Sequence, residues 1–155
     1  TGTVFNTRAG RGFSLEPGHL NAIAPGKKTM HTLNCYAMFK DGRPWVVGGT
    51  PGGDRQPQWN VQAITGMIDF DMTVREAVDT PSWLSWPGTD PAAIDTPLNA
   101  RIGQDVIAEL ERRGHRIDPH GDWNIGSRHQ LIARDENGVL TGASDPRYSG
   151  VSLGY

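Results

Sequence analysis

A glycine-rich turn between a strand and a helix, Gly48 to Asp54, constrains this chain more than any other feature. The apolar run Trp45–Val47 before it is typical of a strand, and Val61–Phe70 after it has the periodicity of a helix. Consecutive glycines let the backbone approach a ligand closely, and amides at a helix N-terminus stabilise an anion. The turn therefore has two interpretations. It is an ordinary tight turn, the more frequent use of glycine, or an oxyanion hole for acyl transfer.

The composition is that of a turn-rich globular protein. The chain has 155 residues, of which 20 are glycine and 11 proline, and this length is one domain's worth. Five tryptophans and clear apolar runs distinguish it from a disordered chain. The sequence contains no repeat or linker, so we expect residues 1–155 to belong to a single domain.

Charge and cysteine content argue against several classes of function. A net charge of −2 gives no electrostatic case for nucleic acid or an anionic membrane, and no apolar run approaches the roughly 18 residues of a membrane span. Cys35 is the only cysteine, and the five histidines form no H-x-x-x-H pair. We therefore expect no metal and no cofactor. We expect a soluble protein, with its compartment (cytoplasmic, periplasmic or secreted) left open.

Turn signals between apolar runs predict two β-hairpins. One turn contains Asp41-Gly42 and the other Asp135–Gly138, and Asp-Gly and Asn-Gly are strong hairpin signals. The flanking runs are Tyr36–Phe39 with Trp45–Val47, and Gln130–Ala133 with Val139–Ala143.

The N-terminal third is expected to be mostly irregular. Thr1–Phe5 alternates loosely, which fits a short strand, and Arg8–Gly12 reads as a loop. Ser14–Lys28 contains two prolines and two glycines, which break regular structure.

Periodicity and capping signals predict three helices. The first, Val61–Phe70, would bury Val61, Ile64, Met67 and Ile68. A short second helix would start with a capping box between Thr73 and Glu76 and end before Pro81. We expect a loop from Ser82 to Pro97, which Trp83 and Trp86 pin to the core.

The third helix, Ile102–Arg113, has the strongest pattern. Gly114 is its expected C-cap, and His115 then leaves the helix. Its apolar face would contain Ile102, Val106, Ile107 and Leu110.

Two polar clusters stand outside these elements. His31 and Thr32 precede a strand and would face opposite sides if extended, so on their own they are best interpreted as loop residues. Asp145-Pro146-Arg147 is interpreted as a structural turn, since Pro146 fixes one dihedral between two opposite charges.

Taken in order, several motifs resemble the gamma-glutamyltranspeptidase family over the whole chain. No single motif is decisive, but their order and spacing are jointly specific. They are Gly2–Leu15, Asn21–Lys28, His31-Thr32-Leu33, Pro51-Gly52-Gly53-Asp54, Ile68-Asp69-Phe70, Glu76–Pro81, Arg113-Gly114-His115, Gly142–Arg147 and the end Leu153-Gly154-Tyr155.

The resemblance implies an α+β fold, part of the four-layer αββα sandwich of N-terminal nucleophile hydrolases. In that family a zymogen cleaves itself autocatalytically into a heterodimer. The new N-terminal Thr of the small subunit attacks an amide and forms an acyl-enzyme, which water or an amine then resolves. The chain resembles the C-terminal part of the small subunit. Its expected partners are the large subunit and the N-terminal part of the small subunit, from one precursor.

The resemblance also suggests roles for individual residues. Gly52 and Gly53 match the family's oxyanion glycines. His31 and Thr32 fall where typical members have two serines that bind the substrate α-carboxylate, and Arg8 falls where they have a polar substrate contact. The His-Thr pair resembles a divergent branch.

One departure concerns the substrate. Typical members carry an acid before the Phe of the first loop, which binds the substrate ammonium, whereas residues 9–13 read Ala-Gly-Arg-Gly-Phe. Arg8 and Arg11 would repel an ammonium and attract an anion. The amide substrate is therefore expected to bear a carboxylate, or to be non-glutamyl, rather than to be glutathione.

Three hypotheses follow. In the first, the chain is part of an amide hydrolase or acyltransferase whose nucleophile lies upstream, outside this chain. In the second, it is a non-catalytic binding or assembly module that retains the fold. In the third, Thr1 is itself the nucleophile.

Overall fold

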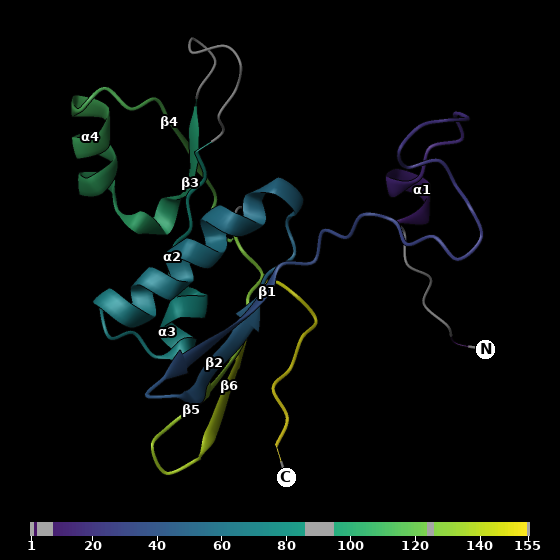
Figure 1. Cartoon of the computed structure of the whole chain (residues 1–155). Helices are drawn as coiled ribbons and strands as arrows, with labels where there is room; N and C mark the ends of the chain where they lie inside the picture. Colours follow the sequence, from purple (N-terminus) through teal and green to yellow (C-terminus); the bar gives the residue numbers. More distant parts are fainter. Residues whose placement is uncertain (1, 3–7, 86–94, 124–125, 155) are drawn as a thin grey trace. The chain divides into compact units, whose positions relative to one another are not determined.

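The computed structural model describes residues 2, 8–85, 95–123 and 126–154. They belong to two compact units, Thr1–Leu33 and Asn34–Tyr155 (Figure 1). Apart from Gly2, the predicted strand over Thr1–Phe5 lies outside the described residues, as do Thr1 and the predicted anchor Trp86.

The described part of the first unit contains a short helix, α1 (Ala9–Gly12), where the sequence predicted a loop. That prediction was wrong because one turn closes locally: the carbonyl of Arg8 accepts hydrogen bonds from the amides of Arg11 at 3.1 Å and Gly12 at 2.7 Å. The following segment is irregular, as expected. It is held by an isolated bridge between Ser14 and Ala22.

The second unit is built on a four-stranded antiparallel sheet of order β1-β2-β5-β6, which confirms both predicted hairpins. In the first turn Asp41 and Gly42 have φ values of 51° and 72°, the positive pair that a two-residue type I′ turn requires. The strands are β1 (Cys35–Lys40), β2 (Arg43–Gly49), β5 (Gln130–Arg134) and β6 (Leu140–Ser144).

Helices α2 (Gln56–Asp69) and α3 (Val74–Asp79) cover one face of this sheet (Figure 1). The core lies between them. Its buried members are Val46, Met67, Val74, Ala77, Val78, Leu131 and Ala143.

The buried side of α2 differs from the predicted one. Of the predicted apolar face only Met67 is buried, while Val61 and Ile68 are exposed. The apolar side chains facing the interior are Trp59, Ala63 and Met67, at four-residue spacing. The error arose because the helix begins at Gln56, before the predicted start at Val61, and its buried face is the one that carries Trp59.

Helix α3 follows its sequence signals. The hydroxyl of Thr73 accepts a hydrogen bond from the amide of Glu76, whose carboxylate accepts from the amide of Thr73, so the capping box is confirmed. The helix ends at Asp79, shortly before Pro81.

A second, parallel two-stranded sheet of β3 (Thr96–Asn99) and β4 (Ile117–His120) was not predicted. Residues 82–84 run antiparallel to β3 through a bridge between Trp83 and Leu98. Because side chains alternate along an extended segment, Ser82 and Leu84 are buried and Trp83 is 41% exposed. The prediction that Trp83 pins this segment to the core was therefore wrong.

The connection between β3 and β4 consists of a 3₁₀ turn, η3 (Ala100–Ile102), and helix α4 (Gln104–Arg112). Ile107 is buried, but Val106 is exposed, contrary to the predicted face. The predicted C-cap is confirmed. Gly114 has φ of 91°, and its amide and that of His115 donate to the carbonyls of Glu111 and Leu110, which is the Schellman pattern.

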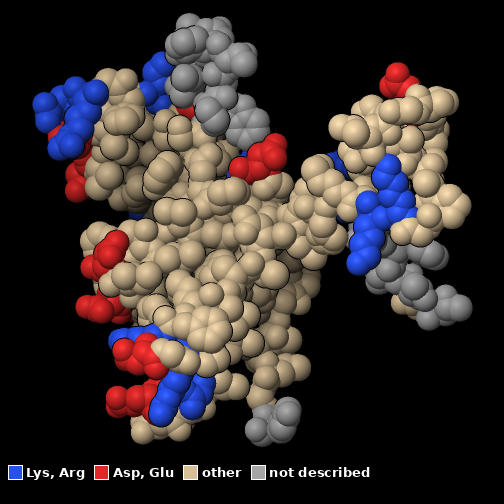
Figure 2. Space-filling view, viewed as in Figure 1, with Lys and Arg blue, Asp and Glu red and all other residues tan. Residues whose placement is uncertain are grey.

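Charges of both signs are mixed on the face seen in Figure 2. They gather at α4, where Glu109 pairs with Arg112 and Arg113, and again at the two hairpin turns. In the part of the chain that the structure describes, no helix has the length and apolar character that crossing a membrane requires.

Candidate active site

The glycine-rich turn lies between the end of β2 and the start of α2. Thr50 and Pro51 follow the strand, and a short 3₁₀ helix, η1 (Gly53–Arg55), leads into α2. Gly52 and Gly53 are both exposed. The turn thus places two exposed peptide groups beside the N-terminal end of a 14-residue helix, where the helix dipole favours negative charge.

Glycine is required at Gly52 for two reasons. Its φ of 154° and ψ of 3° are a combination that L side chains rarely adopt. In addition, a Cβ at this position would lie 2.5 Å from Cζ3 of the Trp59 indole. At Gly53 only the backbone conformation favours glycine, since φ is 58° and no atom lies within 4 Å of an added Cβ.

The amides of this turn have unused hydrogen-bonding capacity. Within the described residues, neither the Gly52 nor the Gly53 amide donates a hydrogen bond, although the carbonyl of Gly52 accepts one from Arg55 at 3.2 Å. Two adjacent amides with open donors are the chemical requirement for binding an oxyanion.

Thr50 is a buried hydroxyl at the base of the turn. Its Oγ1 donates to the carbonyl of Pro51 at 3.0 Å and accepts from the amide of Arg128 at 2.8 Å. Because its proton is already directed to Pro51, Thr50 supports the turn rather than acting as a nucleophile.

His129 lies buried behind the turn, with 2% of its surface exposed. Its Nε2 is 3.2 Å from the carbonyl oxygen of Trp59, so this nitrogen carries the proton and donates. Burial lowers the pKa of His129 to about 4, although the hydrogen bond to Trp59 and the nearby carboxylate of Asp145 oppose the shift. The imidazole is therefore neutral at pH 7.

The turn Asp145-Pro146-Arg147 is a buried ion pair, which confirms its predicted structural role. Asp145 is fully buried, and its Oδ1 accepts from the amide and Nε of Arg147 at 2.9 and 2.7 Å. The guanidinium Nη2 contacts Oδ2. The amide of Asp145 donates to the carbonyl of His129 at 3.0 Å, which joins this turn to the segment behind the glycines.

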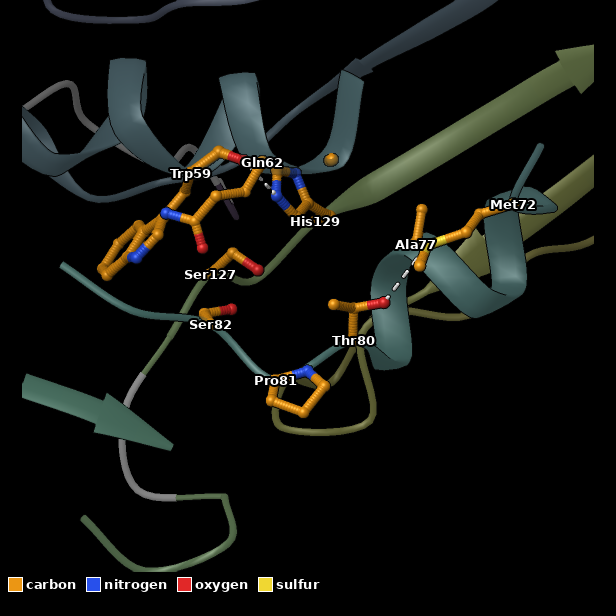
Figure 3. A pocket seen from close by; sticks show the side chains of 10 residues that line it. Trp59, Gln62, Met72, Ala77, Thr80, Pro81, Ser82, Ser127 and His129 are labelled. Carbon is orange, nitrogen blue, oxygen red and sulfur yellow. Dashed lines mark hydrogen bonds between the residues drawn. The ribbon is translucent and has the colours of Figure 1, made fainter. Parts of the chain in front are cut away.

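A small cavity of about 10 Å³ lies between α2, α3 and the segment 127–129 (Figure 3). Several of its lining groups are polar, among them Gln62, Ser82, Ser127 and His129. Its size is about what one ordered water needs, so it is too small for a substrate.

The four predicted substrate-binding residues belong to the first unit, whereas the glycine pair belongs to the second. Arg11 and His31 are exposed, and Arg8 and Thr32 are partly buried. The Nδ1 of His31 accepts a hydrogen bond from the amide of Leu33 at 3.1 Å. The grouping of these four side chains with Gly52 and Gly53 around one substrate stays a prediction.

Three residues around the turn escaped the sequence analysis: Thr50, Trp59 and His129. A Thr directly before Pro-Gly-Gly is a weak signal for a turn-supporting hydroxyl. The contacts of Trp59 and His129 depend on tertiary packing and have no local signature. Among the described residues, no group of three His, Cys, Asp or Glu side chains is placed to hold a metal ion.

Comparison with known proteins agrees with the motif pattern. The family model described as gamma-glutamyltranspeptidase matches residues 1–155. The oxamate amidohydrolase proenzyme of Klebsiella pneumoniae is 38% identical over 157 residues, which cover 100% of this chain and 29% of that protein. The chain thus spans less than a third of the length of this relative.

Solved structures show the same fold. Cephalosporin acylase from Bacillus halodurans matches with a TM-score of 0.71 and 34% identity, over 94% of this chain and 27% of that one. Gamma-glutamyltranspeptidase from Pseudomonas nitroreducens matches with a TM-score of 0.69 and 27% identity, over 92% of this chain and 77% of that one. The predicted α+β class is confirmed, and the chain belongs to the gamma-glutamyltranspeptidase family.

Proposed function

We propose that the complete protein containing this chain is an amide hydrolase or acyltransferase of the gamma-glutamyltranspeptidase type, with Gly52 and Gly53 as its oxyanion hole. The observation that carries this proposal is the pair of open amides on an exposed turn, at a position where packing against Trp59 excludes any side chain. Membership of a family whose curated relatives include amidohydrolase and acylase proenzymes supports it.

The proposed reaction starts from an N-terminal Thr outside this chain. Its hydroxyl oxygen attacks the amide carbon while the terminal amine takes the hydroxyl proton, and the carbonyl oxygen becomes negatively charged between the two glycine amides. Collapse of this intermediate breaks the C–N bond, and the proton leaves with the amine product. Water or an acceptor amine then attacks the ester and releases the Thr.

The proposed substrate is a small amide that bears a carboxylate. Support comes from Arg8 and Arg11 in a segment, residues 8–13, that has no acidic residue to bind an ammonium group. The Klebsiella relative is named for oxamate, which is a small anionic amide. Glutathione, with its α-ammonium group, fits this segment less well.

The proposed partners are the large subunit and the N-terminal part of the small subunit, from one precursor. The sheet face opposite α2 and α3 supports this. Val47 and Ile132 are neighbours on it and are 50% and 51% exposed, although both are large and apolar. Phe39 and Leu140 are also exposed. A second layer packed here would bury these side chains and complete the four-layer sandwich, with residues 1–155 as part of one domain.

The alternative is a non-catalytic module that retains the fold, and mass analysis of the complete precursor distinguishes the two. The enzyme proposal expects two chains, the second beginning with Thr, together with ammonia release from an amide such as oxamate. An uncleaved precursor that releases no ammonia from a panel of amides would favour the module. Full activity of a Thr1→Ala variant would eliminate Thr1 as the nucleophile.

A further inference from the structure

Residues 128 and 129, far along the chain, form hydrogen bonds with residues that precede and follow Gly52 and Gly53. The amide of Arg128 donates to Oγ1 of Thr50 at 2.8 Å, just before the glycines. Nε2 of the next residue, His129, donates to the carbonyl of Trp59 at 3.2 Å, in the first turn of the helix α2 that follows them. These two hydrogen bonds span 78 and 70 residues of sequence, so they are tertiary contacts and not part of the turn itself.

The contact at Thr50 fixes the direction of one oxyanion donor. Oγ1 of Thr50 donates to the carbonyl of Pro51 at 3.0 Å. That carbonyl and the amide of Gly52 belong to one peptide plane, and in a trans peptide they point in opposite directions. Holding the Pro51 oxygen toward Thr50 therefore keeps the Gly52 N–H directed away from Thr50.

The contact at His129 fixes the surface on which Gly52 rests. The indole of Trp59 lies against Gly52, and both Trp59 and His129 are buried. The carbonyl of His129 in turn accepts from the amide of Asp145, at the buried ion pair with Arg147. His129 thus joins the first turn of α2 to a rigid part of the sheet.

We propose that Thr50 and His129 are positioning residues for the oxyanion turn: Thr50 orients the Gly52 amide through Pro51, and His129 holds Trp59 beneath Gly52. The catalytic consequence rests on the proposed function. The positional consequence, the orientation of the Pro51–Gly52 peptide, is independent of it.

Paired substitutions in the complete protein test the proposal. Thr50→Val removes the hydroxyl at nearly constant volume, and Thr50→Ser retains it. His129→Leu removes the donor, and His129→Gln retains an N–H near Nε2. We expect Thr50→Val and His129→Leu to lower kcat about 10- to 100-fold with KM changed less than about twofold, because a donor displaced by about 1 Å weakens mainly the transition state. The Ser and Gln variants should keep kcat within about threefold of the wild type.

Urea unfolding and crystal structures of the four variants separate the outcomes. The positioning role is refuted if kcat of Thr50→Val and of Thr50→Ser falls only in proportion to the fraction of folded enzyme. It is also refuted if the Pro51–Gly52 peptide keeps its orientation in crystals of Thr50→Val. If the wild type hydrolyses no amide while that peptide rotates in Thr50→Val, the proposed function fails and the positioning stands.

Discussion

The indole of Trp59 occupies the space that a side chain at Gly52 would need, with Cζ3 2.5 Å from the position of an added Cβ. Gly52→Ala should therefore destabilise the complete protein by about 2 kcal/mol, from overpacking and backbone strain together. Trp59→Leu in the same molecule should relieve the overpacking part. A double-mutant cycle by urea unfolding should thus give an interaction free energy of about 1 kcal/mol in the relieving direction. Strict additivity would contradict the contact.

Stability should fall in acid because His129 is buried in its neutral form. Its pKa is about 4 in the folded protein against an ordinary value of 6.5, so between these values the unfolded chain binds a proton that the folded chain does not. The contribution is complete above pH 6.5 and is lost as the pH falls toward 4, a total of about 3 kcal/mol. Two charged groups act on the imidazole. The carboxylate of Asp145 opposes the lowering of the pKa, and the guanidinium of Arg147 reinforces it.

Urea unfolding at pH 7, 6 and 5 measures this dependence. His129→Gln should flatten the slope relative to the wild type. His115→Gln, at an exposed helix exit, is the matched control and should leave the slope unchanged. An equal slope in wild type and His129→Gln would show that the imidazole is not buried as described.

Removing one partner of the buried ion pair between Asp145 and Arg147 should lower the free energy of unfolding far more than removing one partner of a surface pair. Arg147→Ala leaves a fully buried carboxylate without its cation, which should cost about 3–5 kcal/mol of unfolding free energy. The pair of an exposed Arg75 and a half-buried Asp79 on α3 is the control, and Arg75→Ala should cost about 1 kcal/mol or less. Similar losses in both variants would refute the distinction.

Arg8 and Arg11 should determine affinity for an anionic amide. We expect Arg8→Ala or Arg11→Ala to raise KM for oxamate about tenfold, the effect of losing one hydrogen bond to a charged group, with kcat nearly unchanged. Arg43→Ala, at an exposed position in the first hairpin, should leave KM unaffected. If neither variant raises KM, these arginines do not bind the substrate anion.

Local signals predicted the elements that local interactions determine. The Asp41-Gly42 turn and the capping box at Thr73 each depend on residues within a few positions, and both were confirmed. The C-cap at Gly114 belongs to the same class.

Tertiary packing determines the features that the sequence patterns did not predict. The burial of Trp59 in place of Val61 depends on where α2 starts after the glycines. The inward position of Leu84 and outward position of Trp83 depend on pairing with β3, whose partner strand β4 lies beyond a helix. For the site, the Pro-Gly-Gly motif located the turn, whereas the contacts of Arg128 with Thr50 and of His129 with Trp59 span 78 and 70 residues of sequence.

The turnover number of Gly52→Ala in the complete protein tests the oxyanion assignment most directly, with Gly42→Ala as control. Gly42 also has positive φ, 72°, and an added Cβ there meets nothing within 4 Å. The account predicts that Gly52→Ala lowers kcat by about 10²- to 10³-fold with KM little changed, as when one oxyanion donor is lost, while Gly42→Ala stays within about twofold of the wild type. A folded Gly52→Ala enzyme with wild-type kcat would contradict it.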